Sequence, residues 1–106
     1  MPNVRLNITR TENGQYLVVV NGEGFFNAVN KEVGARIRGE DTFFDDSLFG
    51  IGSVPIIRVL QNGSFVMSKV VRGSALNEDW GRDEIYALVD VPGYGSKKSN
   101  VVTGYF

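Results

Sequence analysis

Polar and apolar residues alternate along several short stretches of this chain. The first, Asn3–Arg10, carries Val4, Leu6 and Ile8 on one side and polar residues on the other. A period of two places successive side chains on opposite faces of a strand, so the pattern predicts a half-buried β-strand. Alternation and flanking turn residues predict seven antiparallel strands, at residues 3–10, 15–21, 31–38, 54–60, 64–71, 83–91 and 99–106.

Turn residues separate these stretches. Asn13-Gly14 predicts a tight hairpin, because both residues readily adopt positive φ angles. Asn62-Gly63 predicts a second hairpin, which would pair residues 54–60 with residues 64–71. The segment Gly22–Gly24 indicates a bend or bulge after the second strand. Short strands with turns at regular spacing predict an all-β sandwich.

Two segments leave alternatives open. Residues 39–52 combine acidic residues, phenylalanines and glycines, and form either a loop tucked under the sandwich edge or a short extra strand. Residues 83–91 have two apolar faces. The larger face is predicted to point to the core, because four apolar side chains would lose more burial than two if turned outward. Its members are Ile85, Ala87, Val89 and Val91, against Tyr86 and Leu88 on the other face.

The amino-acid composition excludes several classes of function but does not identify one. The protein has 106 residues, a net charge of −1, no cysteine and no histidine. It therefore lacks thiol nucleophiles, Ser–His pairs and histidine metal sites. The near-neutral charge argues against nucleic-acid binding. Because no apolar run approaches the length of a membrane span, we expect no membrane insertion.

Short motifs resemble those of IPT/TIG-type modules, which are immunoglobulin-like (Ig-like) domains. Val18–Phe26, with the sequence VVVNGEGFF, precedes an alternating strand at Val33–Ile37. That order is similar to the beginning of these modules, a strand followed by G-x-G-F. The closing segment Ser99–Phe106 resembles their last strand. The resemblance implies a single Ig-like β-sandwich domain over residues 1–106, and seven strands is the usual Ig-like number.

The resemblance also implies a role without catalysis. Such modules act as spacers, adhesion, ligand-binding or dimerisation domains, so we expect a non-enzymatic binding or structural module of a larger surface or secreted protein. Its partner would be a protein or a carbohydrate. An extracellular or cell-surface location follows from the resemblance, although the absence of cysteine fits the cytoplasm equally well.

Two other functions stay open. One is a calcium-dependent carbohydrate-binding module. The other is a homo-oligomer, a subunit that self-assembles when the edge strand Val54–Leu60 or Ser99–Phe106 pairs with another copy. These alternatives differ in what they require, since the first needs a metal site and the second an exposed strand edge.

Eight of the 12 acidic residues fall into two clusters, within residues 40–46 and 78–84. In an Ig-like order the two loops emerge at the same end, so the clusters should face each other. Calcium binds several carboxylate and amide oxygens from flexible loops. The candidate calcium ligands are Glu40, Asp41, Asp45, Asp46, Asn77, Glu78, Asp79 and Asp83. The alternative is that both clusters lie in solvated loops, where nearby arginines offset their charge. Apart from possible calcium, we expect no cofactor to be required.

The opposite end of the sandwich gathers Tyr94, Lys97, Lys98 and Phe25. An aromatic ring beside two lysines suits a sugar ring, a peptide or an acidic partner, and loops at a sandwich end often recognise ligands. The alternative is that Phe25 belongs to the core and that the lysines lie in a solvated turn.

Overall fold

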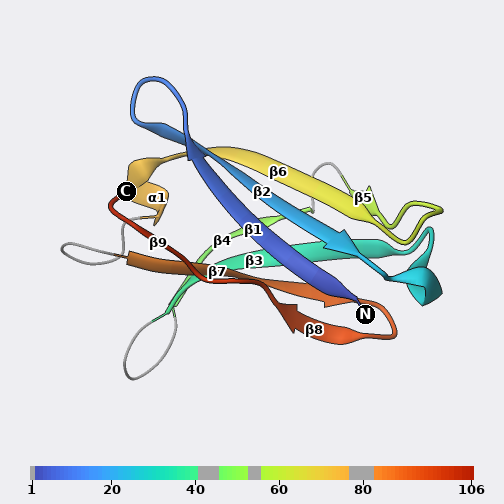
Figure 1. Ribbon diagram of the computed structural model, residues 1–106. Coiled ribbons are helices and arrows are strands. Elements are labelled where there is room, and N and C mark those ends of the chain that lie inside the picture. The colour runs from blue at the N-terminus through green and yellow to red at the C-terminus, as the bar shows by residue number, and fades with distance from the viewer. Residues whose placement is uncertain (1, 41–45, 53–55, 77–82) are drawn as a thin grey trace.

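The computed structural model describes residues 2–40, 46–52, 56–76 and 83–106, and it is an all-β sandwich of two antiparallel sheets (Figure 1). Strands β1, β2 and β6 form one layer, which crosses the other layer at an angle. The strands are β1 (Asn3–Arg10), β2 (Gln15–Glu23), β3 (Glu32–Gly39), β4 (Asp46–Ile51), β5 (Ile57–Arg58), β6 (Phe65–Arg72), β7 (Asp83–Val91), β8 (Gly95–Lys98) and β9 (Val102–Gly104). A 3-10 turn, η1 (Phe26–Ala28), and a single helical turn, α1 (Gly73–Leu76), complete the described elements.

Each sheet has a simple order. The first is β1-β2-β6, with β2 at its centre. The second is β4-β3-β7-β8, in which β5 continues beside β3 and β9 continues beside β7. All of these strand pairs are antiparallel, and their backbones are joined by hydrogen bonds across the sheet. The long strands β3 and β7 therefore form the rigid centre of the second sheet.

The core lies between the sheets, where the alternating apolar rows meet. Val4 and Leu6 of β1 are buried, as the pattern predicts. The predicted core face of β7 is also confirmed, because its four residues are each at most 2% exposed. Tyr86, on the opposite face, is 4% exposed as well, so β7 is covered on both sides over part of its length.

Several predicted boundaries are wrong. Only residues 57 and 58 of the segment 54–60 are described as a strand, and this strand pairs with β3 rather than with β6. The turn at Asn62-Gly63 is present, but β6 pairs with β2. Only Val102–Gly104 of the predicted final strand 99–106 forms a strand, β9, and β8 (Gly95–Lys98) precedes it in a segment where no strand was predicted. Residues 39–52 contribute strand β4, which agrees with one of the two alternatives for that segment. The described strands therefore number nine rather than seven.

The glycine at position 22 serves packing rather than bending. Strand β2 continues through Gly22 to Glu23, and the change of direction predicted within Gly22–Gly24 falls on Gly24, whose φ angle is +83°. Gly22 faces Phe65 of β6 in the register. The Phe65 ring occupies the space of the missing side chain, since a Cβ on Gly22 would lie 2.1 Å from its Cε2.

A polar clasp joins the two sheets along β1. The side chain of Asn100 accepts a hydrogen bond from the Leu6 backbone N–H at 2.8 Å and donates one to the Leu6 carbonyl at 3.0 Å. Ser99 supports this clasp, because its Oγ accepts from the Ala87 N–H at 2.8 Å and donates to the Asn100 carbonyl at 2.8 Å. The amide of Asn100 thus takes the place of a neighbouring strand on the edge of β1.

Candidate functional site

The outer face of the second sheet contains a groove of about 630 Å³, near the turn that joins β7 to β8. Gly34 of β3 forms part of its floor, opposite Asp90 of β7, which in turn pairs with Ser96 of β8. A Cβ on Gly34 would meet only the Ile51 carbonyl oxygen, at 3.8 Å. The missing side chain therefore leaves an open depression on an otherwise regular sheet.

Two acidic residues line this depression. Glu32 lies two residues before Gly34 on the same face of β3, and Asp90 lies across from it on β7. The Ser96 hydroxyl donates a hydrogen bond of 2.5 Å to Oδ1 of Asp90. The described residues that line the groove include no lysine or arginine. The lining therefore carries negative charge.

Two arginines approach the same carboxylates from outside the lining. Nη2 of Arg36 lies 3.4 Å from both carboxylate oxygens of Asp90, and Nη2 of Arg58 lies 3.5 Å from Oε1 of Glu32. Charge-assisted hydrogen bonds are usually about 2.7–2.9 Å long, so both pairs are loose. All four side chains are roughly half exposed. Such surface pairs contribute little to stability.

Apolar groups complete the rim. Ile56 is 56% exposed and lies against the groove, together with Val91 and Pro92. A second, smaller hollow of about 240 Å³ shares Gly34 and Asp90 with the groove and reaches Gly50 of β4, and its lining includes Arg36. The site is therefore an elongated depression lined by two acidic residues and by aliphatic groups.

Lys98, one of the predicted ligand-binding residues, is used within the fold. Its ammonium group lies 2.9 Å from Oε2 of Glu40 and 4.4 Å from the centroid of the Tyr86 ring. The contact covers Tyr86 on the outer face of the second sheet. Lys97, next to it, is half-buried. Lys98 itself stays exposed, so ligand binding by these lysines stays a prediction.

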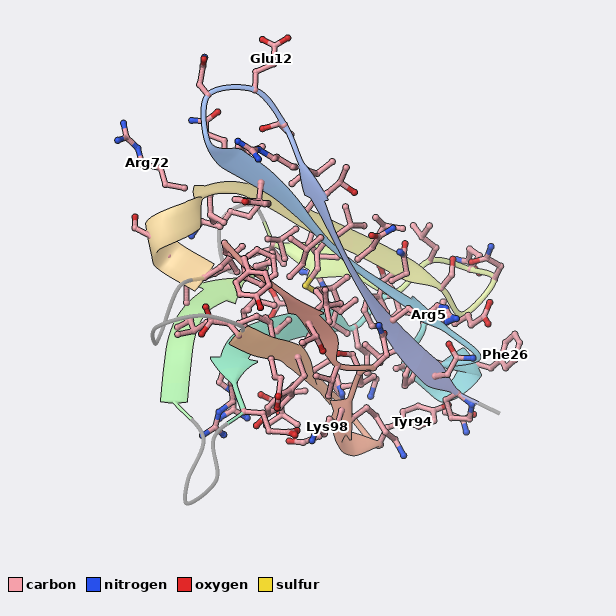
Figure 2. The ribbon with its side chains drawn as sticks, turned by 60° about the vertical axis from the view of Figure 1, so that its left-hand side comes forward. Arg5, Glu12, Phe26, Arg72, Tyr94 and Lys98 are labelled. Carbon is pink, nitrogen blue, oxygen red and sulfur yellow. The ribbon has the colours of Figure 1, made fainter. Side chains whose placement is uncertain are left out.

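The predicted cluster of loops at the other end does come together. Tyr94 packs edge to face on Phe25, with ring centroids 5.0 Å apart, and its Oη accepts a hydrogen bond from the Asn27 N–H at 3.0 Å. Phe25 is fully buried, so the alternative that it belongs to the core holds and it offers no surface to a ligand. The exposed ring is Phe26, which is 67% exposed and projects outward at this end (Figure 2).

Most of the proposed calcium ligands lie outside the described residues. This applies to Asp41, Asp45, Asn77, Glu78 and Asp79, and for Asp46 only the backbone is described. Of the others, Glu40 pairs with Lys98 and Asp83 is 5% exposed. The Glu40 N–H donates to the Glu84 carbonyl at 2.8 Å, so the bases of the two acidic segments are adjacent. Within the described ranges, no group of three or more acidic side chains is placed to hold a metal ion.

The groove was not predicted from the sequence. Gly34 interrupts an alternating strand, and glycine in the interior of a strand often marks the close approach of a ligand or another backbone. That signal was present in the sequence. The position of Asp90 opposite Gly34 was not, because strand register depends on the whole sheet.

No helix in the described part of the protein is both long enough and apolar enough to cross a membrane. Comparison of the sequence and fold with protein-family models, with curated proteins and with solved structures gives no match.

Proposed function

We propose that this protein is a non-enzymatic binding module whose ligand site is the groove over Gly34, and that the ligand presents a positive charge. The observation that carries the proposal is the pair of acidic residues, Glu32 and Asp90, which line one hollow and are each only loosely paired with an arginine. A site on central sheet strands is rigid, which suits recognition without large rearrangement. The surface or secreted setting stays a prediction.

An arginine side chain of a protein partner fits the groove best. Its planar guanidinium can donate two parallel hydrogen bonds to one carboxylate, and Asp90 is half exposed and reachable. Its aliphatic stem would lie along the exposed face of Ile56 and beside Pro92. The ligand guanidinium would replace the loose contact of Arg36, in which a single nitrogen lies 3.4 Å from both oxygens.

The calcium-dependent carbohydrate alternative has less support at this groove. Sugar rings are commonly held by stacking on aromatic faces, and no aromatic residue is among the described residues of its lining. Calcium binding by the acidic segments is a separate proposal. It is tested by comparing melting in calcium and in chelator, and an unchanged midpoint would contradict a stabilising site.

Self-assembly through strand edges also has less support. The proposed edges are short, because β5 has two residues and β9 has three, and both pair within the second sheet. Strand β6, at one edge of the first sheet, is longer than β5 and β9. Lys69 lies on the inward-facing side of β6, and its ammonium group is 5.4 Å from the centroid of the Phe49 ring. A charge at such a position discourages edge-to-edge pairing. Light scattering at high concentration tests this, and a concentration-dependent dimer would favour assembly.

The binding proposal is tested by NMR titration of the ¹⁵N-labelled protein with N-acetyl-arginine amide. The matched control ligand is N-acetyl-citrulline amide, which keeps the shape but not the charge. We expect arginine to shift the amides of Gly34, Asp90 and Ser96 with millimolar affinity, and citrulline to shift them far less. Equal shifts from both ligands, or shifts elsewhere, would contradict the proposal.

Charge variants then assign the contact. Asp90→Asn should weaken arginine binding by roughly fivefold, because one charge-assisted contact on an exposed site is lost. Glu32→Gln should also weaken it, because Glu32 is the second acidic residue of the lining. Glu12→Gln, at the exposed hairpin tip, is the matched control and should leave the affinity unchanged.

A further inference from the structure

The dipeptide Asn-Gly occurs three times in the sequence, at residues 13–14, 21–22 and 62–63. Asparagine followed by glycine is the sequence most prone to spontaneous deamidation, because glycine has no side chain to hinder its own backbone nitrogen. The fold places the three copies in three different environments. The rates of deamidation at the three sites can therefore be compared within one protein.

The reaction needs only water. The glycine backbone nitrogen attacks Cγ of the asparagine, a bond forms between these two atoms, and the bond from Cγ to Nδ2 breaks. The glycine nitrogen loses its proton and ammonia leaves, which gives a five-membered succinimide. Water then opens the ring at either carbonyl, and the product is aspartate or isoaspartate. No electron transfer is involved, and water is the only other reactant.

Asn13-Gly14 is open to this reaction. Both residues are exposed in the loop between β1 and β2, with φ angles of 60° and 70°. Nothing lies within 4 Å of a Cβ built on Gly14. Among the hydrogen bonds of the described residues, none uses the Gly14 N–H or the Asn13 side chain. The attacking nitrogen and the attacked amide are therefore both accessible, and neither has to give up a hydrogen bond before the attack.

Asn62-Gly63 is held by hydrogen bonds. Oδ1 of Asn62 accepts from the Ser64 N–H at 3.1 Å and from the Ser64 hydroxyl at 2.6 Å. The Gly63 N–H, which is the nucleophile, donates to the Leu60 carbonyl at 2.9 Å. Gly63 is also buried, against the ring of Phe26. The attack requires these contacts to break first.

Asn21-Gly22 is held by the sheet. It lies in β2, the central strand, where Asn21 pairs with Arg5 on one side and Val66 on the other. Gly22 is buried beneath the Phe65 ring. An extended, doubly paired backbone cannot bring the glycine nitrogen onto the preceding side chain unless the sheet opens.

We propose that Asn13 is a site of spontaneous deamidation in the native protein, whereas Asn21 and Asn62 are protected by the fold. The product adds a negative charge beside Glu12, at the tip of the hairpin (Figure 2). Isoaspartate also inserts an extra carbon into the backbone of the turn. The turn is docked on α1, since the Gly73 N–H donates to the Gly14 carbonyl at 3.1 Å. Modification therefore loosens the contact between the hairpin and α1.

The test is a time course of the folded protein at mildly alkaline pH, followed by peptide mapping that separates aspartate from isoaspartate. A parallel sample in denaturant gives the rate of each site without structure. We expect native Asn13 to react at close to its denatured rate, and Asn62 and Asn21 to react at least roughly tenfold more slowly than theirs, because hydrogen bonds must open first. Asn13→Gln should remove the fast reaction and leave the other two sites unchanged.

Two results would overturn the proposal. One is native Asn62 or Asn21 reacting as fast as Asn13. The other is native Asn13 slowed relative to its denatured rate as strongly as the other two sites. The consequence for α1 has its own readout, because hydrogen exchange of the Gly73 amide should be faster in aged protein than in fresh protein or in aged Asn13→Gln. Equal exchange in all three samples would contradict the loosened contact.

Discussion

Replacing Gly22 by alanine should destabilise the protein strongly, although alanine is ordinarily the mildest substitution for glycine. The added Cβ would lie 2.1, 2.2 and 2.8 Å from three carbons of the Phe65 ring. Ordinary contacts between carbons are about 3.5–4.0 Å, so the ring or the strand must move by more than an ångström. Phe65 is 1% exposed and packs on Phe25, with ring centroids 5.4 Å apart, which leaves it little room.

The magnitude follows from the packing of this region. Inserting a methyl group into a filled core costs about 1–3 kcal/mol, and the upper part of that range applies where the obstacle is a buried ring. Alanine recovers roughly 0.5–1 kcal/mol, because glycine loses more backbone freedom on folding. We expect a net loss of about 1–2 kcal/mol in the free energy of unfolding, or a melting temperature lower by about 5–15 °C for a domain of this size.

The assay is urea denaturation followed by circular dichroism, with Gly34→Ala as the control. A Cβ on Gly34 makes no contact closer than 3.8 Å, so Gly34→Ala should be neutral or slightly stabilising. A second measurement places Gly22→Ala in a Phe65→Leu background. Leucine lacks the two ring atoms that lie 2.1 and 2.2 Å from the new Cβ, so the penalty for Gly22→Ala should fall by about 1 kcal/mol. An unchanged penalty in that background, or equal effects of the two glycine substitutions, would refute the packing argument.

Three further substitutions test contacts that define the fold. Asn100→Ala removes both hydrogen bonds to the Leu6 backbone and should cost about 1–2 kcal/mol, with faster hydrogen exchange at the Leu6 amide; unchanged exchange would contradict the clasp. Lys98→Met removes the exposed pair with Glu40 and should cost less than about 1 kcal/mol in urea denaturation, so a larger loss would indicate an unrecognised role. Tyr94→Phe keeps the ring but not the hydrogen bond, and should cost about 0.5–1.5 kcal/mol by thermal melting.

The alternation of side chains was sufficient to predict the fold class and much of the core. Strand β1 has its predicted bounds, and the faces of β1 and β7 are those that the apolar pattern indicated. This succeeded because burial of one face of a strand leaves a period of two in the sequence. The hairpin at Asn13-Gly14 was predictable for the same local reason, since the turn requires positive φ angles at both residues.

Pairing between distant strands was not predictable in the same way. The turn at Asn62-Gly63 indicated a hairpin of two long strands, yet β6 pairs with β2. A local turn signal does not reveal that a strand gains more by joining a distant partner. The groove has the same origin, because Glu32 and Asp90 are brought together only by the register of β3 and β7. Phe25 and Phe26 show the limit most clearly, since adjacent identical residues have opposite fates, one buried and one exposed.

The most direct test of the binding proposal is to fill the groove. Gly34→Leu places a side chain in the depression over the floor of the site, where the backbone leaves room for it. We predict that this variant keeps its thermal stability and its dispersed NMR spectrum, and that N-acetyl-arginine amide no longer shifts the amides of Asp90 and Ser96. A stable Gly34→Leu variant that binds the arginine ligand as well as the unmodified protein would contradict the proposed site.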